Sequence, residues 1–261
     1  KLIHQFVGTR LDAARVENAI DTEKPFDSGD VAAVKDSDQL TPSAGALTAC
    51  NSEEGLKSYR VPGPPARVQN AEKNKVLKGK WMANVFGGSF NLAQAFCSNG
   101  SLAEGYDKAY SKDHDFTNPN VVRDFKRKVK AKRFHVVSFD FPCGTWSRAR
   151  RPGGNGPGPL RGEDVTGDLY GYEDLSEVDK AKVIEGNLLL KVTVELAHFC
   201  LQNGILVIVE NPLTSRAWKT KEMKELLNRP GTHIIPTDYC QYGFEWKKPT
   251  KIVVITPDAS P

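Results

Sequence analysis

The chain has few of the features that mark membrane, secreted or zinc-binding proteins. Its 261 residues include only five cysteines and five histidines, with no CxxC pair and no histidine at zinc-ligand spacing. No apolar run approaches the roughly 20 residues that span a bilayer, and no basic-then-apolar secretory pattern follows Lys1. The odd, scattered cysteines therefore predict an intracellular, reducing compartment without structural zinc, which is the nucleus if the source is eukaryotic.

The apolar content limits the size of the core, and the distribution of charge indicates the kind of partner. With 39% hydrophobic residues the chain can bury one substantial core, so one catalytic-size domain is expected. The net charge of +4 is mild, but basic residues cluster at 123–133 and 148–161. Such runs are commonly solvated faces. Because these two flank one apolar segment, they favour a phosphate-bearing substrate. The lack of a spanning apolar run is the reason that we expect no membrane.

Composition divides the chain near residue 75. Residues 21–65 are rich in Ser, Asp, Gly and Pro without a sustained period, and only residues 10–20 before them have helical spacing. We therefore expect a polar N-terminal arm or linker over residues 1–75 and a single domain over residues 76–261. A first residue other than Met indicates a fragment or a processed piece.

The second part alternates between strand-like and helix-like patterns. This alternation predicts an α/β fold with a Rossmann-like, doubly wound, mostly parallel sheet and helices on both faces. The expected strands are Trp81–Phe86, Leu102–Tyr106, a short one near Val121, Phe134–Phe141, Ile205–Glu210, Thr232–Asp238 and Lys251–Ile255. The expected helices are Asn91–Ser98 and Asp179–Asn203, the second of which has an apolar stripe and a favourable cap at Asn203-Gly204.

The first expected strand leads into a glycine turn. Phe86, Gly87 and Gly88 precede a helix whose first N–H groups are free to bind a ligand, although a tight strand-to-helix turn needs glycine in any case. Asp107 follows the next strand about 20 residues later, where doubly wound folds bind ribose hydroxyls. The turn and the acid together favour a nucleotide-like ligand. The alternative for Asp107 is a helix cap.

Two later strands end on reactive residues. The segment SFDFPCG ends at Pro142-Cys143, and VIVENP places Glu210 and Asn211 at the end of another strand. Open α/β folds carry their chemistry at this carboxyl edge of the sheet. Cys143 is the candidate nucleophile, the alternative being an incidental buried cysteine. Glu210 is its candidate electrostatic partner, the alternative being a cap or an ion pair with Arg216.

A nucleophilic cysteine needs a stabilised thiolate. The ordinary thiol pKa near 8.5 leaves little thiolate at neutral pH. We expect Arg148, Arg150 and a helix start after Gly144 to lower the pKa of Cys143.

In this order, the glycine turn, Asp107, Pro142-Cys143 with Ser147, and Glu210-Asn211 resemble the carbon-5 cytosine DNA methyltransferases, which use S-adenosylmethionine. The resemblance covers about residues 80–256, and CQYGFEWKKPTKI is similar to a late segment of related sequences. It implies that Cys143 adds to carbon 6 of cytosine, while a partly protonated Glu210 bonds the ring N3 and amine. The cofactor-binding residues that it implies are Phe86, Gly87, Gly88, Asp107, Asp124 and Pro142. Asp140 is a further candidate, and a cap is the alternative for Asp124 and Asp140.

The segment 144–171 is long, glycine-rich and basic. We expect a mobile lid that closes over an extruded base, or else a surface loop. Trp146 either stacks on that base or packs under the loop. The expected nucleic-acid contacts are Ser147, Arg148, Arg150, Arg151 and Arg161.

The chain departs from the family pattern at several positions. Asn84 and Phe90 stand where an aspartate and a glycine are usual, which predicts reduced cofactor affinity. Lys247 and Lys248 stand where arginines are usual. Gly186-Asn187 is expected on a helix surface.

No segment resembles a target-recognition domain, so the arm, the lid or a partner protein would read the target. The predicted function is S-adenosylmethionine-dependent methylation of cytosine carbon 5 in DNA. RNA suits the basic loop equally. The alternative of another class is a non-catalytic, methyltransferase-like module that binds nucleic acid or a protein.

Overall fold

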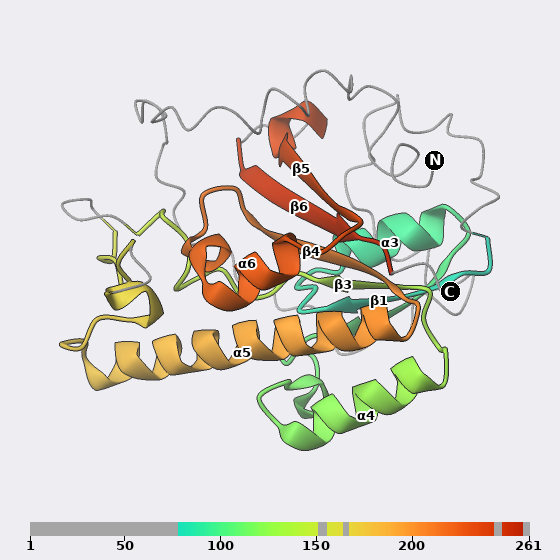
Figure 1. Ribbon diagram of the computed structural model, residues 1–261, viewed down its shortest axis with the longest axis horizontal. Coiled ribbons are helices and arrows are strands. Elements are labelled where there is room, and N and C mark those ends of the chain that lie inside the picture. The colour runs from blue at the N-terminus through green and yellow to red at the C-terminus, as the bar shows by residue number, and fades with distance from the viewer. Residues whose placement is uncertain (1–77, 151–155, 164–166, 243–246, 258–261) are drawn as a thin grey trace. The chain divides into compact units, whose positions relative to one another are not determined.

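A six-stranded sheet forms the centre of the computed structural model, which describes residues 78–150, 156–163, 167–242 and 247–257. The strand order is β2-β1-β3-β4-β6-β5 (Figure 1). The strands are β1 (Trp81–Val85), β2 (Leu102–Tyr106), β3 (Val136–Phe139), β4 (Leu206–Pro212), β5 (Thr232–Asp238) and β6 (Pro249–Ile255). The pairs β1–β2, β1–β3 and β3–β4 are parallel. The predicted Rossmann-like α/β fold class is confirmed.

Helices cover both faces of this sheet (Figure 1). α3 (Asn91–Ser98) lies on one face, whereas α4 (Pro119–Lys130) and α5 (Glu177–Gln202) lie on the other, with α6 (Lys221–Leu227) beside α5. Short 3₁₀ turns are η3 (Lys112–His114), η4 (Asp168–Tyr170), η5 (Arg216–Lys219) and η6 (Tyr239–Tyr242). The core between the sheet and α4–α5 holds fully buried aliphatic residues of β3 and β4 and an aromatic cluster around Phe125.

The long helix α5 follows the predicted pattern closely. The hydroxyl of Ser176 accepts a hydrogen bond from the Asp179 N–H at its start, and Gly204 follows its end with φ 72°. All five residues of the predicted stripe are buried: Val183, Leu190, Val194, Ala197 and Leu201. Val183, near the start of α5, packs beside Gly171 and Arg161, and the later part of the helix packs on β3 and β4 and leads back to the start of β4.

The expected strand near Val121 is wrong. Residues 119–130 form α4, with Asn118 as N-cap and Pro119 in the first turn. Only Phe125 and Val129 of this helix are buried. The helical periodicity is therefore weak in the sequence, because these two apolar residues stand among many charged ones. The sheet therefore has six strands within the described residues, where about seven were expected.

The expectation of a mostly parallel sheet is met, and β6 is the strand whose direction is reversed. β6 lies between β4 and β5 and runs antiparallel to both. It therefore begins at the edge where β4 ends, and Thr250 lies opposite Pro212. This reversal brings residues just before β6 to the carboxyl edge.

No helix among residues 78–150, 156–163, 167–242 and 247–257 is long and apolar enough to cross a membrane. The boundary near residue 75 stays a prediction, because residues 1–77 lie outside the described part of the chain.

Candidate active site

The ends of β3 and β4 bring the two predicted catalytic residues to one edge of the sheet. The strands pair in parallel up to Phe139 and Val209. Beyond that point the side-chain amide of Asn211 donates a hydrogen bond of 2.9 Å to the backbone oxygen of Phe141. This bond ties the end of β4 to the turn that carries Cys143.

A lysine completes this edge. Because β6 begins where β4 ends, Lys248 lies beside Glu210, with 3.9 Å between its Nζ and Oε1 of the glutamate. Lys248 also lies 3.5 Å from the Tyr239 hydroxyl and interacts electrostatically with Cys143. These four residues, Cys143, Glu210, Lys248 and Tyr239, are called the Cys143 cluster below.

Burial sets the protonation of this cluster. It raises the pKa of Glu210 to about 7, with Lys248 opposing and Asp140 adding to the shift. Burial also raises the pKa of the Cys143 thiol, which Lys248 lowers and Glu210 raises further. Within the described residues no group donates a hydrogen bond to the buried Oε1 of Glu210. A buried carboxylate oxygen that has an ion-pair partner, Lys248, but no hydrogen-bond donor in the described part of the chain is suited to binding a polar ligand.

The cations expected to activate Cys143 are engaged elsewhere. Arg148 pairs with Glu163 at 3.2 Å, and Arg150 donates to the backbone oxygens of Gly144 and Gly158 at 3.1 and 3.2 Å. Residues 144–146 form a turn, so no helix begins there. The expectation was therefore wrong, and Lys248 is the cation that lowers the pKa of the thiol.

Arg216 is likewise not the partner of Glu210. Its Nη2 lies 3.0 Å from Glu163, and its Nη1 donates to the Ser147 backbone oxygen at 3.0 Å. The structural alternative for Glu210, an ion pair with Arg216, is excluded.

Packing explains much of the glycine turn. A Cβ at Gly87 would lie 2.5 Å from both the Asn84 side-chain oxygen and the Phe90 ring, and one at Gly105 would lie 2.6 Å from that ring. Gly88 has φ 52°, which glycine adopts freely. The Phe90 ring, only 7% exposed, thus occupies the space beside the turn.

Asp107 holds the same turn in place. Its Oδ2 accepts the Gly88 N–H at 3.1 Å, and its Oδ1 accepts the Ala109 N–H at 2.9 Å. Asp107 is not a helix cap, which was the alternative for this residue, because a turn follows it directly. Each carboxylate oxygen keeps a second lone pair for a ligand hydroxyl.

A small cavity of about 50 Å³ lies beside Asp107 and is also lined by Phe86, Phe116, Pro142 and Leu189. Three predicted cofactor residues therefore meet. The carboxylate and the Phe86 ring suit the adenosine part of S-adenosylmethionine. The volume is far below the roughly 300–1,000 Å³ of ligand pockets. The Phe86 and Phe116 rings, 5.4 Å apart between centroids, would have to separate to admit the cofactor.

Asp124 does not join this cavity. It lies on the exposed face of α4, where it pairs with Arg127 at 2.7 Å. Its predicted place in a third strand was wrong, because residues 119–130 are helical.

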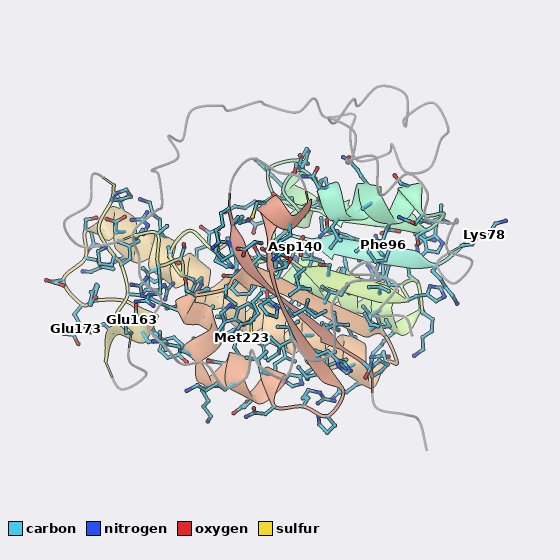
Figure 2. The ribbon with its side chains drawn as sticks, turned by 90° about the horizontal axis from the view of Figure 1, so that it is seen from above. Lys78, Phe96, Asp140, Glu163, Glu173 and Met223 are labelled. Atoms are coloured by element: carbon cyan, nitrogen blue, oxygen red, sulfur yellow. The ribbon has the colours of Figure 1, made fainter. Side chains whose placement is uncertain are left out.

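Asp140, labelled in Figure 2, directly follows β3, which is one of the two central strands of the sheet. Its carboxylate accepts hydrogen bonds from the Asn84 amide at 2.8 Å and the Ser138 hydroxyl at 2.6 Å. Burial raises its pKa, and those two hydrogen bonds oppose the shift. Asn84 thus donates its hydrogen bond to the acid that directly follows β3.

The described parts of segment 144–171 are anchored. Trp146, Arg161 and Leu169 have no exposed surface. The Trp146 indole donates to the Gly186 backbone oxygen at 3.3 Å, which settles its packing under the loop. A lid made of the whole segment is therefore not what the structure shows.

Arg161 cannot reach a phosphate. Its guanidinium stacks 3.5 Å above the Trp146 ring centroid and donates to Asn187 at 2.6 Å and Thr145 at 2.9 Å. The prediction of a nucleic-acid contact was wrong. Gly186 is buried against the same guanidinium, so Gly186-Asn187 is not on a helix surface either.

The remaining predicted contacts lie nearer to solvent. Arg148 is exposed, and Ser147 and Arg150 are partly exposed. The Ser147 hydroxyl accepts the Ala149 N–H at 3.1 Å. Arg151 lies outside the described residues.

Sequence reasoning named Lys248 only as a departure and did not name Tyr239. Tyr239 directly follows β5, which runs in the same direction as β4, so its place after an expected strand could have indicated it. Lys248 precedes β6, whose antiparallel direction no pattern in the sequence indicates.

Among solved structures, the chain is similar to the Entamoeba histolytica methyltransferase EhMeth, with 12% sequence identity and a TM-score of 0.40 over 70% of this chain and 54% of that one. The chain thus spans about half the length of that protein. No protein-family model and no curated protein matches the sequence.

Proposed function

We propose that this chain is a cytosine carbon-5 methyltransferase that acts on nucleic acid, with DNA as the substrate that the sequence resemblance favours. The Cys143 cluster carries the proposal, because a thiol, a carboxyl with a pKa of about 7 and an ammonium group meet at the carboxyl edge. A cytosine extruded from its stack presents an electrophilic carbon 6 and a basic N3 to such a site.

In the proposed reaction the Cys143 thiolate forms a bond to carbon 6, and the electrons of the carbon 5–carbon 6 double bond move toward carbon 5 and N3. Protonated Glu210 hydrogen-bonds N3 and stabilises that charge. Carbon 5 would take a methyl group as the sulfur–carbon bond of the donor breaks and its electron pair stays on sulfur. The hydrogen of carbon 5 is then lost as a proton to solvent water, the double bond reforms, and the Cys143 thiolate leaves carbon 6. S-adenosylmethionine supplies the methyl group when bound, and Asp107 and Phe86 would hold its adenosine part.

The test is covalent trapping on DNA that contains 5-fluorocytosine, in the presence of S-adenosylmethionine. Fluorine blocks the loss of the carbon 5 substituent, so we expect a stable adduct with the wild type and none with Cys143→Ser. Cys240→Ser, which changes an exposed thiol, should keep the adduct. An adduct that survives Cys143→Ser removes this thiol from the mechanism. An RNA strand of the same sequence tests the other substrate.

The second candidate function is a non-catalytic module that binds nucleic acid or protein. The 50 Å³ cavity and the closed packing of Phe90 favour it. Absence of both the adduct and binding of millimolar S-adenosylmethionine by the wild type would select this candidate.

A further inference from the structure

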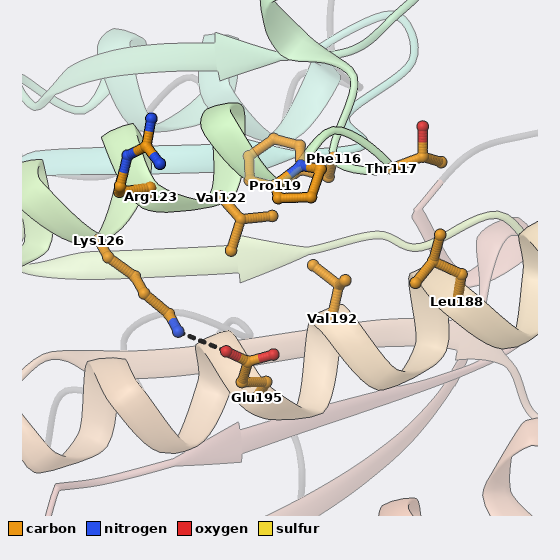
Figure 3. A pocket seen from close by; sticks show the side chains of 9 residues that line it. All are labelled: Phe116, Thr117, Pro119, Val122, Arg123, Lys126, Leu188, Val192 and Glu195. Atoms are coloured by element: carbon orange, nitrogen blue, oxygen red, sulfur yellow. Dashed lines mark hydrogen bonds and ion pairs between the residues drawn. The ribbon is translucent and has the colours of Figure 1, made fainter.

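A groove runs between α4 and α5, on the face of the sheet that these two helices cover. It lies away from the Cys143 cluster. Its volume is about 410 Å³, within the range of ligand-binding clefts. Figure 3 shows the α4 side chains facing those of α5 across it, with Lys126 and Glu195 paired at one end. The groove is much larger than the cavity beside Asp107.

The floor of the α4–α5 groove is apolar. Phe116, Val122, Leu188 and Val192 line it. Leu188 is 40% exposed, and Ile184, one turn earlier on the same helix, is 65% exposed. Large aliphatic side chains at i and i+4 that stay open to solvent mark a surface that a partner can cover.

The rim of the groove is basic on the α4 side. Arg123 and Lys126 line it, and α4 carries five basic residues against one acidic residue, Asp124. Glu195 on the α5 side engages Lys126, whereas Arg123 donates only to Asn120 on its own helix among the contacts of its side chain that are described. The unpaired positive charge favours an acidic partner.

We propose that the α4–α5 groove binds an amphipathic helix of a partner protein, with an apolar face and an acidic flank. Apolar residues spaced i and i+4 would pack on Val122, Leu188 and Val192, and carboxylates on the flank would face Arg123. A helix laid between two helices is a common recognition mode, and its apolar stripe matches this floor. Nucleic acid fits less well, because its phosphate backbone would leave the apolar floor of the groove uncovered.

This inference does not depend on the proposed methyltransferase activity. It uses residues of α4, α5 and Phe116, none of which belongs to the Cys143 cluster. Cys143→Ser should therefore bind the partner helix as the wild type does.

The probe is a panel of fluorescein-labelled 20-residue helical peptides with leucines at i, i+4 spacing and a glutamate flank, titrated against the full 261-residue chain by anisotropy. Lysine-flanked peptides of the same spacing are the control panel. We expect saturable binding of at least one acidic peptide, weaker binding of its lysine counterpart, and loss of affinity as salt rises.

Two variants test the location. Leu188→Asp should weaken the best peptide at least tenfold, whereas Ile234→Asp, at an equally exposed residue on β5, should not. Arg123→Glu should also weaken binding of the best peptide, and it leaves the apolar floor of the groove unchanged. This variant takes the place of Leu188→Asp in the test if Leu188→Asp does not fold. The proposal is overturned if no acidic peptide shows saturable binding, or if Leu188→Asp and Ile234→Asp change the affinity of the best peptide equally. It is also overturned if duplex DNA displaces the peptide from the wild type but not from Arg123→Glu.

Discussion

At the scale of single residues, the reactivity of Cys143 depends on one cation. Burial and Glu210 raise the pKa of its thiol, and Lys248 lowers it. The arginines that surround Cys143 in the sequence are instead held by Glu163 and by backbone oxygens. Proximity along the chain is therefore a poor guide to the local field, because charges act through space and are cancelled by their partners.

Replacing Lys248 by methionine should slow alkylation of Cys143. Loss of the cation raises the pKa of the thiol further, so less of it is thiolate at a given pH, and we expect modification to slow roughly three- to tenfold. The rate of iodoacetamide modification at pH 8 should fall accordingly, measured on the peptide that contains Cys143 so that exposed Cys240 does not interfere. Arg148→Met is the matched control and should leave the rate unchanged. Equal slowing by both variants would contradict the role of Lys248.

The raised pKa of Glu210 makes stability depend on pH. Its pKa is about 7 in the folded chain and ordinarily 4.5, so the folded state binds more protons between these values. The free energy of unfolding therefore falls as pH rises from about 5 to 7, by up to about 3 kcal/mol. Above pH 7 a charged, buried carboxylate remains.

Glu210→Gln removes this titration while keeping the shape of the side chain. We expect it to match the wild type near pH 5 and to exceed its unfolding free energy by about 1–3 kcal/mol at pH 8, measured by urea denaturation at both pH values. Glu225→Gln on the exposed face of α6 controls for loss of a surface charge. A difference of the same size at pH 5 and pH 8 would show that the pKa of Glu210 is not raised.

At the scale of elements, strands and helices with a clear periodicity of apolar residues were predictable from the sequence. Residues whose position depends on the order and direction of the strands were not. The apolar runs that form β1 to β4 and the stripe of α5 follow directly from side-chain periodicity. α4 was missed because only Phe125 and Val129 mark its buried face. α6 was missed because seven residues hold too little pattern.

The candidate site divides in the same way. Cys143 and Glu210 were predictable because each follows a strand in a parallel sheet. Lys248 reaches them only because β6 runs antiparallel, and no local pattern encodes strand direction. Arg161 was misassigned because a sequence does not show which arginine of a basic run finds a buried aromatic ring.

The contact between α5 and segment 144–171 should be intolerant of a single methyl group. A Cβ at Gly186 would lie 2.7 Å from the Thr145 hydroxyl and 2.9 Å from the Arg161 guanidinium. Gly186→Ala should therefore destabilise the chain by about 1–2 kcal/mol, because overpacking outweighs the helix propensity that alanine gains. Gly158→Ala, with no atom within 4 Å of the added Cβ, is the control in the same denaturation assay. A stabilised Gly186→Ala would show that this contact is loose.

At the scale of the whole molecule, one residue joins two regions. Phe116 lines both the cavity beside Asp107 and the α4–α5 groove. Its ring is 1% exposed and contacts those of Phe86 and Phe125. If S-adenosylmethionine binds in the cavity beside Asp107 as proposed, the cavity has to widen by rearrangement of this aromatic packing. The apparent affinity would then be lowered in proportion to the fraction of molecules in which the cavity is open.

Phe116→Leu should therefore tighten binding of S-adenosylmethionine. The smaller side chain removes one wall of the cavity and leaves Asp107 and Phe86, so a larger fraction of molecules is open, and we expect a roughly three- to tenfold lower Kd by isothermal titration calorimetry. Phe125→Leu truncates a neighbouring buried ring that does not line the cavity and should leave Kd unchanged. Thermal denaturation of both variants separates loss of fold from change of affinity. If the two variants bind alike, or if Phe116→Leu binds more weakly than the wild type, the ring does not close the cofactor site.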